Sequence, residues 1–230
     1  MVRLAPCSRL EWGDNVTTLG PYELNTIITG DARELAKAIP DESVDLVFCD
    51  PVYDRIDDYR WLAETAARVL KPDGNALAFV NSKWITRITK QCHTINPLLA
   101  LVIRNGPAPL NGRVISKVHH LLWFGSGKLV GYMPDFWQTT RPWSRINTHN
   151  HKWTKDPNYI KTVFNAFTYP GATIFDPFTG GGVIPAVCKM LHRNYLAFEI
   201  DPETADMARK RVAETQPPLP LVMPEQLELI

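Results

Sequence analysis

The chain has 230 residues, of which 45% are hydrophobic and 21% charged, and its formal net charge is +1. This composition is typical of a folded globular protein and excludes a disordered or collagen-like chain. No apolar run approaches the roughly 20 residues that a membrane-spanning helix needs. The beginning, Met1–Leu10, lacks the continuous apolar core of a signal peptide. The four cysteines form no CxxC pair, which argues against a zinc knuckle or a disulfide framework and favours a reducing cytoplasm.

Short β-rich runs alternate with helical periods along the chain, and this alternation predicts an α/β protein. The expected strands are 26–29, 44–49, 76–80, 98–103, 118–124, 173–175 and 195–200. The expected helices are 32–39, 59–70, 83–93, 158–168, 183–192 and 202–212. The segments 71–74 and 169–171 carry the proline and glycine of turns.

We predict a single domain over residues 1–215. Within it, residues 105–150 are rich in proline and glycine and show little helical period, so they are expected to form a loop-rich insertion that recognises the target. Residues 216–230 begin with Gln216-Pro217-Pro218-Leu219-Pro220, which predicts an extended tail.

Charge is unevenly distributed along the chain. Residues 75–155 contain 11 lysines and arginines but one acid, Asp135, and five of the seven tryptophans. Basic and aromatic side chains together can neutralise phosphates and stack on bases, so we expect this segment to contact nucleic acid rather than to be only a solvated face. The candidate DNA-binding residues are Arg104, Arg113, Lys117, Arg141 and Arg145.

An acid, a proline and an aromatic residue follow the apolar run 44–49, in the order Asp50-Pro51-Val52-Tyr53. Methylation of a base amine needs acceptors for the amine N–H groups and an aromatic face for the ring. The Asp50 carboxylate and the Pro51 carbonyl can be the two acceptors, and stacking on Tyr53 is worth about 1–3 kcal/mol per base. Taken alone, the motif also fits an ordinary Asp-Pro turn with a packed tyrosine. Its place at a strand end makes these three residues the candidate catalytic set.

A second motif follows the run 173–175, where Asp176-Pro177-Phe178 leads into a glycine turn that includes Gly180 and Gly182. Glycines at such a turn let the backbone approach a nucleoside-like cofactor closely. About 20 residues later Glu199 ends the next strand, where an acid can bind ribose hydroxyls. Asp201 is expected to cap the following helix. Asp31 is expected to cap the helix 32–39, and it can also accept from an adenine amine.

The ordered motifs resemble the β class of DNA amino-methyltransferases, in which the catalytic motif precedes the glycine motif. The resemblance spans about Thr26 to Val212, including Leu70-Lys71-Pro72-Asp73-Gly74, His151, Lys155, Pro157 and Arg193-Asn194-Tyr195. It implies a Rossmann-like methyltransferase fold with a mostly parallel seven-stranded sheet, an antiparallel hairpin and helices on both faces. It also implies S-adenosylmethionine as the cofactor, and double-stranded DNA as the partner in a prokaryotic or phage-encoded cytoplasmic enzyme. The family's cofactor contacts then fall on Asp31, Asp176, Phe178, Gly180, Gly182 and Glu199, with Lys155 near the cofactor carboxylate.

Three departures from the family pattern bear on activity. Val52 stands where the family has a second proline, which makes the catalytic loop less rigid. The glycine turn reads Thr179-Gly180-Gly181-Gly182, without the serine that the family commonly has. An extra residue, Asp156, separates Lys155 from Pro157.

Several alternatives stay open at this stage. The leading acid of the catalytic motif resembles adenine-N6 enzymes, but one pocket can admit either base amine, so a cytosine-N4 enzyme is the first alternative. A catalytically impaired module that binds DNA and cofactor is the second, and an RNA or protein amine is the third target. Pro6-Cys7 lies before any expected strand, in the wrong context for a cysteine nucleophile. His119-His120 fits a core or sheet-edge position better than a metal site.

The last residues of the sequence suggest one protein partner, and the family resemblance suggests another. The last residues, Gln226–Ile230, resemble the short peptide with which bacterial replication proteins bind the sliding clamp, although the tail can equally fold back on the domain or pair with a second subunit. Family members are often homodimers, which makes a homodimer a further expectation.

Overall fold

The structure is a computed structural model. It describes residues 18–52, 54–91, 98–103, 110–111, 114–115, 118–124, 127, 129–132, 136–138 and 155–217. For residues 91, 98–103, 110–111, 114–115, 118–119 and 136–138 it describes the backbone alone. Within these ranges no helix is both long and apolar enough to cross a membrane.

An eight-stranded sheet organises the molecule, in the order β10-β6-β9-β5-β4-β11-β12-β3. Strand β9 runs antiparallel to its neighbours β5 and β6, and the other neighbouring pairs are parallel. The strands are β3 (Thr26–Thr29), β4 (Val44–Cys49), β5 (Leu70–Val80), β6 (Leu98–Ile103), β9 (Val118–Phe124), β10 (Phe136–Gln138), β11 (Thr173–Asp176) and β12 (Asn194–Glu199). Two small hairpins pair β1 (Thr18–Leu19) with β2 (Tyr22–Glu23), and β7 (Leu110–Asn111) with β8 (Val114–Ile115).

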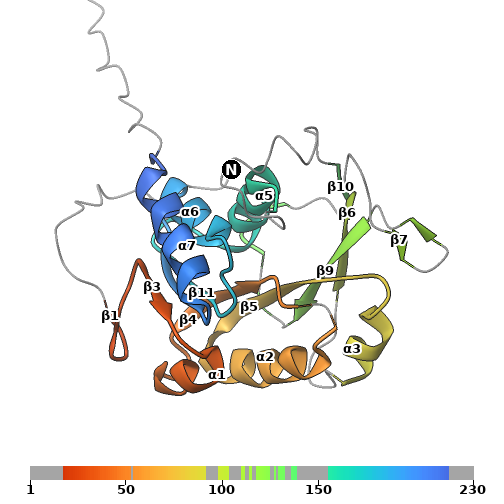
Figure 1. The fold of residues 1–230 in the computed structure, drawn as a ribbon, viewed down its shortest axis with the longest axis horizontal. Coiled ribbons are helices and arrows are strands. Elements are labelled where there is room, and N and C mark those ends of the chain that lie inside the picture. The colour runs from red at the N-terminus through yellow and green to blue at the C-terminus, as the bar shows by residue number, and fades with distance from the viewer. Residues whose placement is uncertain are drawn as a thin grey trace, which may run out of the picture.

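Helices cover both faces of this sheet (Figure 1). On one face lie α1 (Ala32–Leu35) with the 3-10 turn η1 (Ala36–Ala38), α2 (Ile56–Val69) and α3 (Ile85–Gln91). On the other face lie α5 (Pro157–Phe167), α6 (Val183–Met190) and α7 (Pro202–Glu214). A mostly parallel sheet with helices on both faces is the arrangement that buries near-continuous apolar strands such as β4.

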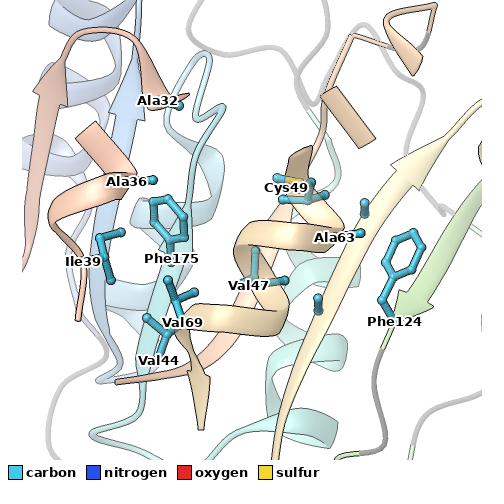
Figure 2. Close-up of a cluster of buried hydrophobic side chains, with 14 of the residues drawn as sticks. Ala32, Ala36, Ile39, Val44, Val47, Cys49, Ala63, Val69, Phe124 and Phe175 are labelled. Atoms are coloured by element: carbon cyan, nitrogen blue, oxygen red, sulfur yellow. The ribbon is translucent and has the colours of Figure 1, made fainter. Parts of the chain in front are cut away.

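Two buried clusters separate the helices from the sheet. Figure 2 shows the first, in which Ala36 and Ile39 after α1 and Val69 of α2 lie over Val47 of β4 and Phe175 of β11. The second cluster, on the opposite face, packs α5 and α6 against β4, β5 and β11. Because both faces of β4 and β11 are buried, the ends of these strands are held rigidly, which matters for any side chain that follows them.

The predicted α/β class and mostly parallel sheet are confirmed, and the observed sheet has one more strand than expected, the edge strand β10. The largest difference is β5, which begins at Leu70 rather than at Ala76. Val44 pairs with Leu70 and Leu46 with Asn75, so the predicted turn residues 71–74 are accommodated by a register shift inside the strand.

Candidate active site

The carboxyl ends of five parallel strands meet at one edge of the sheet. Strand β4 lies beside β11, and the strand order reverses between them, because β5 follows β4 on one side of the pair and β12 follows β11 on the other, with β3 beyond it. The ligands of such sheets bind where the strand order reverses, outside the carboxyl ends of the strands. We call the ends of β4 and β5 the catalytic half of this edge, and the ends of β11, β12 and β3 the cofactor half.

In the catalytic half, Asp50 follows β4 directly and makes an ion pair. The Lys155 Nζ lies 2.7 Å from Asp50 Oδ2, and the two side chains are 10% and 22% exposed. The other carboxylate oxygen, Oδ1, is buried and accepts no hydrogen bond from a described residue. Asp50 is therefore held in one orientation with one acceptor atom still available.

The rest of the predicted catalytic motif is only partly visible. Pro51 is buried, whereas Val52 is 57% exposed and its carbonyl accepts a hydrogen bond from the Arg55 N–H at 3.1 Å. Tyr53 lies outside the described residues, so its stacking role stays a prediction.

In the cofactor half, Asp176 ends β11 and is fully buried. Burial, with a smaller contribution from the negative charges of Glu199 and Asp50, raises the pKa of its carboxyl to about 8. A contact with the Thr179 side chain and a 3.3 Å hydrogen bond from the Phe178 N–H act in the opposite direction. No described donor makes a hydrogen bond to its Oδ2 atom. Such a carboxyl is poised to receive a cation or a hydrogen-bond donor from a ligand.

The turn after Asp176 depends on its glycines. Gly180 and Gly182 have φ angles of 49° and 73°, in the left-handed region that favours glycine. A Cβ atom on Gly182 would come within 2.8 Å of the Ala208 backbone, so α6 and α7 approach closely only at a glycine. The Thr179 N–H donates to the Phe198 carbonyl at 3.0 Å, which ties the turn to β12. The Thr179 hydroxyl is buried, without a hydrogen-bond partner among the described residues.

Glu199 ends β12 and is fixed by backbone donors. Its Oε2 accepts from the Gly180 N–H at 2.9 Å, and its Oε1 accepts from the Asp201 N–H at 3.0 Å. Each carboxylate oxygen has a second lone pair, so the side chain can still accept from a ligand hydroxyl. The Gly30 N–H donates to the Glu199 carbonyl at 2.8 Å, which places Asp31 beside the same edge.

Two predicted helix caps are confirmed. The Asp31 side chain accepts from the Arg33 N–H at 2.9 Å at the start of α1, and Asp201 accepts from the Thr204 N–H at 2.9 Å at the start of α7. Asp156, the extra residue of the family comparison, has the same role at α5, accepting from the Asn158 N–H at 2.9 Å. The expected contact of Asp31 with an adenine amine stays a prediction.

Sequence reasoning missed the support behind Phe178. The Phe178 ring makes an edge contact with Trp61 of α2, with ring centroids 5.6 Å apart. The Arg33 guanidinium lies 5.5 Å from the Trp61 ring and makes a 2.6 Å ion pair with Asp58. These contacts join α1 and α2 to the cofactor half, and since the residues are distant in sequence no local motif could have revealed them.

The predicted DNA-binding residues lie outside the described residues, and so do most of residues 105–150. Two other cations do lie near the carboxyl end of β5. The Lys83 Nζ and the Arg87 guanidinium lie 4.8 Å and 5.4 Å from the Trp84 ring, and both side chains are exposed. No group of metal-ligating side chains occurs in the part of the chain that the structure describes. His120 instead contacts the Ser82 hydroxyl at 2.7 Å, and burial lowers its pKa.

A hollow of about 750 Å³ opens at the opposite edge of the sheet. It is lined by residues that begin the strands, including Asp45 of β4, Lys71 of β5 and Ala172 before β11. Asp45 makes a 2.8 Å ion pair with Lys71 and accepts from the Thr173 N–H at 2.8 Å, so its charge is already satisfied. Unpaired buried acceptors lie at the carboxyl edge, and we therefore assign the chemistry to that edge.

Two family models match the chain. One, described as "DNA methylase", matches residues 123–210, and the other, described as "Methyltransferase domain", matches residues 12–78. Type II methyltransferase M.HinfI of Haemophilus influenzae is 27% identical over an alignment of 264 positions. The alignment covers 90% of this chain and 72% of the relative. Type II methyltransferase M.BamHI of Bacillus amyloliquefaciens is 23% identical, and the match covers 81% of this chain but 58% of the relative.

Solved structures agree with these sequence matches. The complex of M1.HpyAVI with SAM superposes with a TM-score of 0.68 at 22% identity, covering 81% of this chain and 98% of that protein. The cytosine-N4-specific PvuII DNA methyltransferase superposes with a TM-score of 0.67 at 18% identity, covering 80% and 85%. The chain thus has the fold of these two DNA methyltransferase structures, and its residues 123–210 match the DNA methylase family model.

Proposed function

We propose that this protein is an S-adenosylmethionine-dependent DNA methyltransferase that transfers a methyl group to the exocyclic N6 amine of adenine. The observation that carries the proposal is the juxtaposition of Asp50 and Asp176 at the ends of the adjacent strands β4 and β11. One buried acid has an acceptor available for an amine N–H, and the other has an acceptor available for a cofactor. Methyl transfer needs these two ligands side by side.

The cofactor half fits S-adenosylmethionine. Its methionine part carries an ammonium group, which suits the buried Asp176 Oδ2, and its ribose carries two hydroxyls, which suit Glu199. The positive φ angle at Gly180 favours glycine, so no Cβ atom lies beside the N–H that binds the Glu199 carboxylate. When bound, the cofactor supplies an electrophilic methyl group on its sulfonium.

In the catalytic half, the residues orient the target amine. The lone pair of an exocyclic amine is delocalised into the ring, and acceptors for its N–H groups localise that lone pair on nitrogen. Asp50 Oδ1 is the first acceptor, the Pro51 carbonyl is the second and Tyr53 provides the stacking face. Positioning and electrostatic orientation of this kind supply most of the rate enhancement, and the reaction requires no covalent nucleophile.

The target amine lies inside a duplex, so the base has to be flipped out of the stack at a cost of a few kcal/mol. Double-stranded DNA is therefore the proposed partner. The exposed Lys83 and Arg87, held against Trp84 beside β5, are suited to phosphate contacts at this edge, in addition to the arginines and lysine predicted from the sequence. Homodimer formation and clamp binding through Gln226–Ile230 remain predictions.

Adenine is favoured by the acid that begins the catalytic motif, since that feature resembles adenine-N6 enzymes. Cytosine-N4 is the alternative target, because the same acceptors serve either amine. An impaired module is the other alternative, and the observation in its favour is the exposed Val52 in place of a proline.

Incubation with S-adenosylmethionine and unmethylated DNA, followed by digestion to nucleosides and mass spectrometry, tests the proposal. We expect N6-methyladenine from the wild-type protein and a loss of about 10²–10³-fold or more in rate for Asp50→Ala, because one preorganised electrostatic group is removed. Asp57→Asn, an exposed aspartate of α2, is the matched control and should leave the rate unchanged. N4-methylcytosine would overturn the base assignment, and no product with cofactor and DNA bound would favour the impaired module.

A further inference from the structure

The ion pair between Lys155 and Asp50 joins two regions that are far apart in the sequence. Asp50 follows β4, whereas Lys155 directly precedes the cap of α5. The family resemblance places this lysine near the cofactor carboxylate, but in the structure its Nζ lies 2.7 Å from a catalytic oxygen. Both side chains are largely buried, so the contact is shielded from the solvent that weakens surface ion pairs.

The start of α5 fixes the position of Lys155. Asp156 caps the helix through its side chain and Pro157 occupies the first turn, so the backbone that follows the lysine is constrained. The Nζ also lies 4.9 Å from the centroid of the Phe79 ring, a residue of β5 that is 1% exposed. The ammonium group is thus placed by a helix cap on one side and by an aromatic face on the other.

The ion pair makes the two oxygens of Asp50 unequal. Oδ2 is bound to Lys155, and Oδ1 is buried without a hydrogen bond from a described residue. A free carboxylate can rotate and exchange its oxygens, whereas the ion pair with Lys155 favours the orientation in which Oδ2 is bound and Oδ1 is not. Since reacting groups have to be held in a near-attack geometry, this asymmetry decides which atom meets the substrate.

The positive charge of Lys155 also matters for the acids at this edge. Asp50 and Glu199 act on Asp176 through space, so three carboxyl groups lie within electrostatic reach of each other. An ammonium group beside Asp50 offsets one of these charges and holds a buried carboxylate that otherwise lacks a partner at Oδ2.

We propose that Lys155 is a positioning residue for the reaction, which holds Asp50 Oδ2 so that Oδ1 accepts the N–H of the target amine. This inference rests on the proposed function. It differs from the family expectation in one measurable respect, because a lysine that acts through Asp50 affects methyl transfer and a lysine that binds the cofactor affects cofactor affinity.

The test compares Lys155→Gln and Lys155→Arg with the wild-type protein. The single-turnover rate at saturating cofactor and DNA should fall about 10–100-fold in Lys155→Gln, because Asp50 loses its fixed orientation. The dissociation constant for S-adenosylmethionine, measured by calorimetry, should stay unchanged, and Lys155→Arg should recover most of the rate. Lys161→Gln, on the helix α5 that follows Lys155, is the matched control and should behave as wild type.

Weakened cofactor binding with an unchanged saturated rate would overturn the inference and restore the family role of Lys155. An unchanged rate in Lys155→Gln would also overturn it. If the wild-type protein methylated no DNA, that result would count against the proposed function instead. The ion pair would then be tested by a measurement that does not depend on activity. Urea unfolding of wild type, Lys155→Gln, Asp50→Asn and the double variant should show non-additive changes in the free energy of unfolding. Additive changes would exclude the pairing itself.

Discussion

The two halves of the carboxyl edge hold their acids in different ways. In the cofactor half, Glu199 is bound by two backbone N–H groups, those of Gly180 and Asp201. In the catalytic half, Asp50 is bound by a side chain, Lys155, from another region of the chain. A backbone-held acid is secured by the fold of its own turn, whereas a side-chain-held acid depends on one residue. The cofactor half should therefore resist neighbouring substitutions better than the catalytic half.

Among the substitutions that test this comparison, Glu199→Gln in the cofactor half should have the largest effect. An amide has one acceptor oxygen and cannot accept from both backbone N–H groups, so one hydrogen bond to a charged carboxylate is lost at a cost of about 1–3 kcal/mol. We expect the dissociation constant of S-adenosylmethionine to rise by roughly 5- to 150-fold. Calorimetry measures this constant, with the exposed Glu203→Gln as control. An unchanged affinity would show that the two backbone bonds do not shape the cofactor half.

Asp176→Asn tests the electrostatics that the halves share. Burial, followed by the charges of Glu199 and Asp50, raises the pKa of Asp176 to about 8 from 3.8. Between these values the folded protein holds a proton that the unfolded chain has lost, so stability should decrease as the pH rises through this range. The asparagine variant should lack this decrease. Urea unfolding at about pH 6 and about pH 9, without cofactor, measures the difference.

The same group predicts a proton release. An ammonium ligand favours the ionised carboxylate, so cofactor binding below about pH 8 should release a proton in the wild type and less in Asp176→Asn. Calorimetry in buffers of different ionisation enthalpy measures that release. If both proteins showed the same pH dependence and the same proton release, Asp176 would not be a neutral acid in the ligand-free fold.

Val52→Pro is the smallest test and affects the catalytic half alone. Val52 is 57% exposed, and its N–H donates to no described residue, so a proline removes chain entropy without removing a described hydrogen bond. We expect stability to rise by about 0.4–1 kcal/mol, and the rate of methyl transfer to rise by roughly 2- to 5-fold. Cofactor affinity should not change. Val52→Ala, which leaves the backbone flexible, is the control, and a slower Val52→Pro enzyme would contradict the idea that the loop lacks rigidity.

The positions of the residues in the cofactor half could be predicted because their signals are local, and their contacts with a cofactor stay a prediction. Asp176, the glycine turn and Glu199 lie within one strand-turn-helix-strand unit, and the caps Asp31 and Asp201 directly precede their helices. The catalytic half was less predictable. The Asp50 motif was visible, but its pairing with Lys155 is a tertiary contact that no spacing encodes.

Secondary structure shows the same contrast between local and distant interactions. The strands β3, β4 and β6 have the predicted bounds, since each is a short apolar run. The start of β5 was missed because pairing of Leu70 with Val44 extends the strand through a segment with the proline and glycine of a turn. The raised pKa of Asp176 could not be foreseen either, since complete burial is a property of the fold.

The strand order has a consequence for how the protein is made. Strand β3 is the edge strand beside β12, and the Asn25 N–H donates to the Tyr195 carbonyl at 2.7 Å. During synthesis β3 leaves the ribosome long before β12 and has to wait for it. The acid Glu199 joins the turn at Gly180 at that same late moment. Long-range pairing of this kind slows folding, so the nascent chain becomes able to form its cofactor half only after β12 has been made.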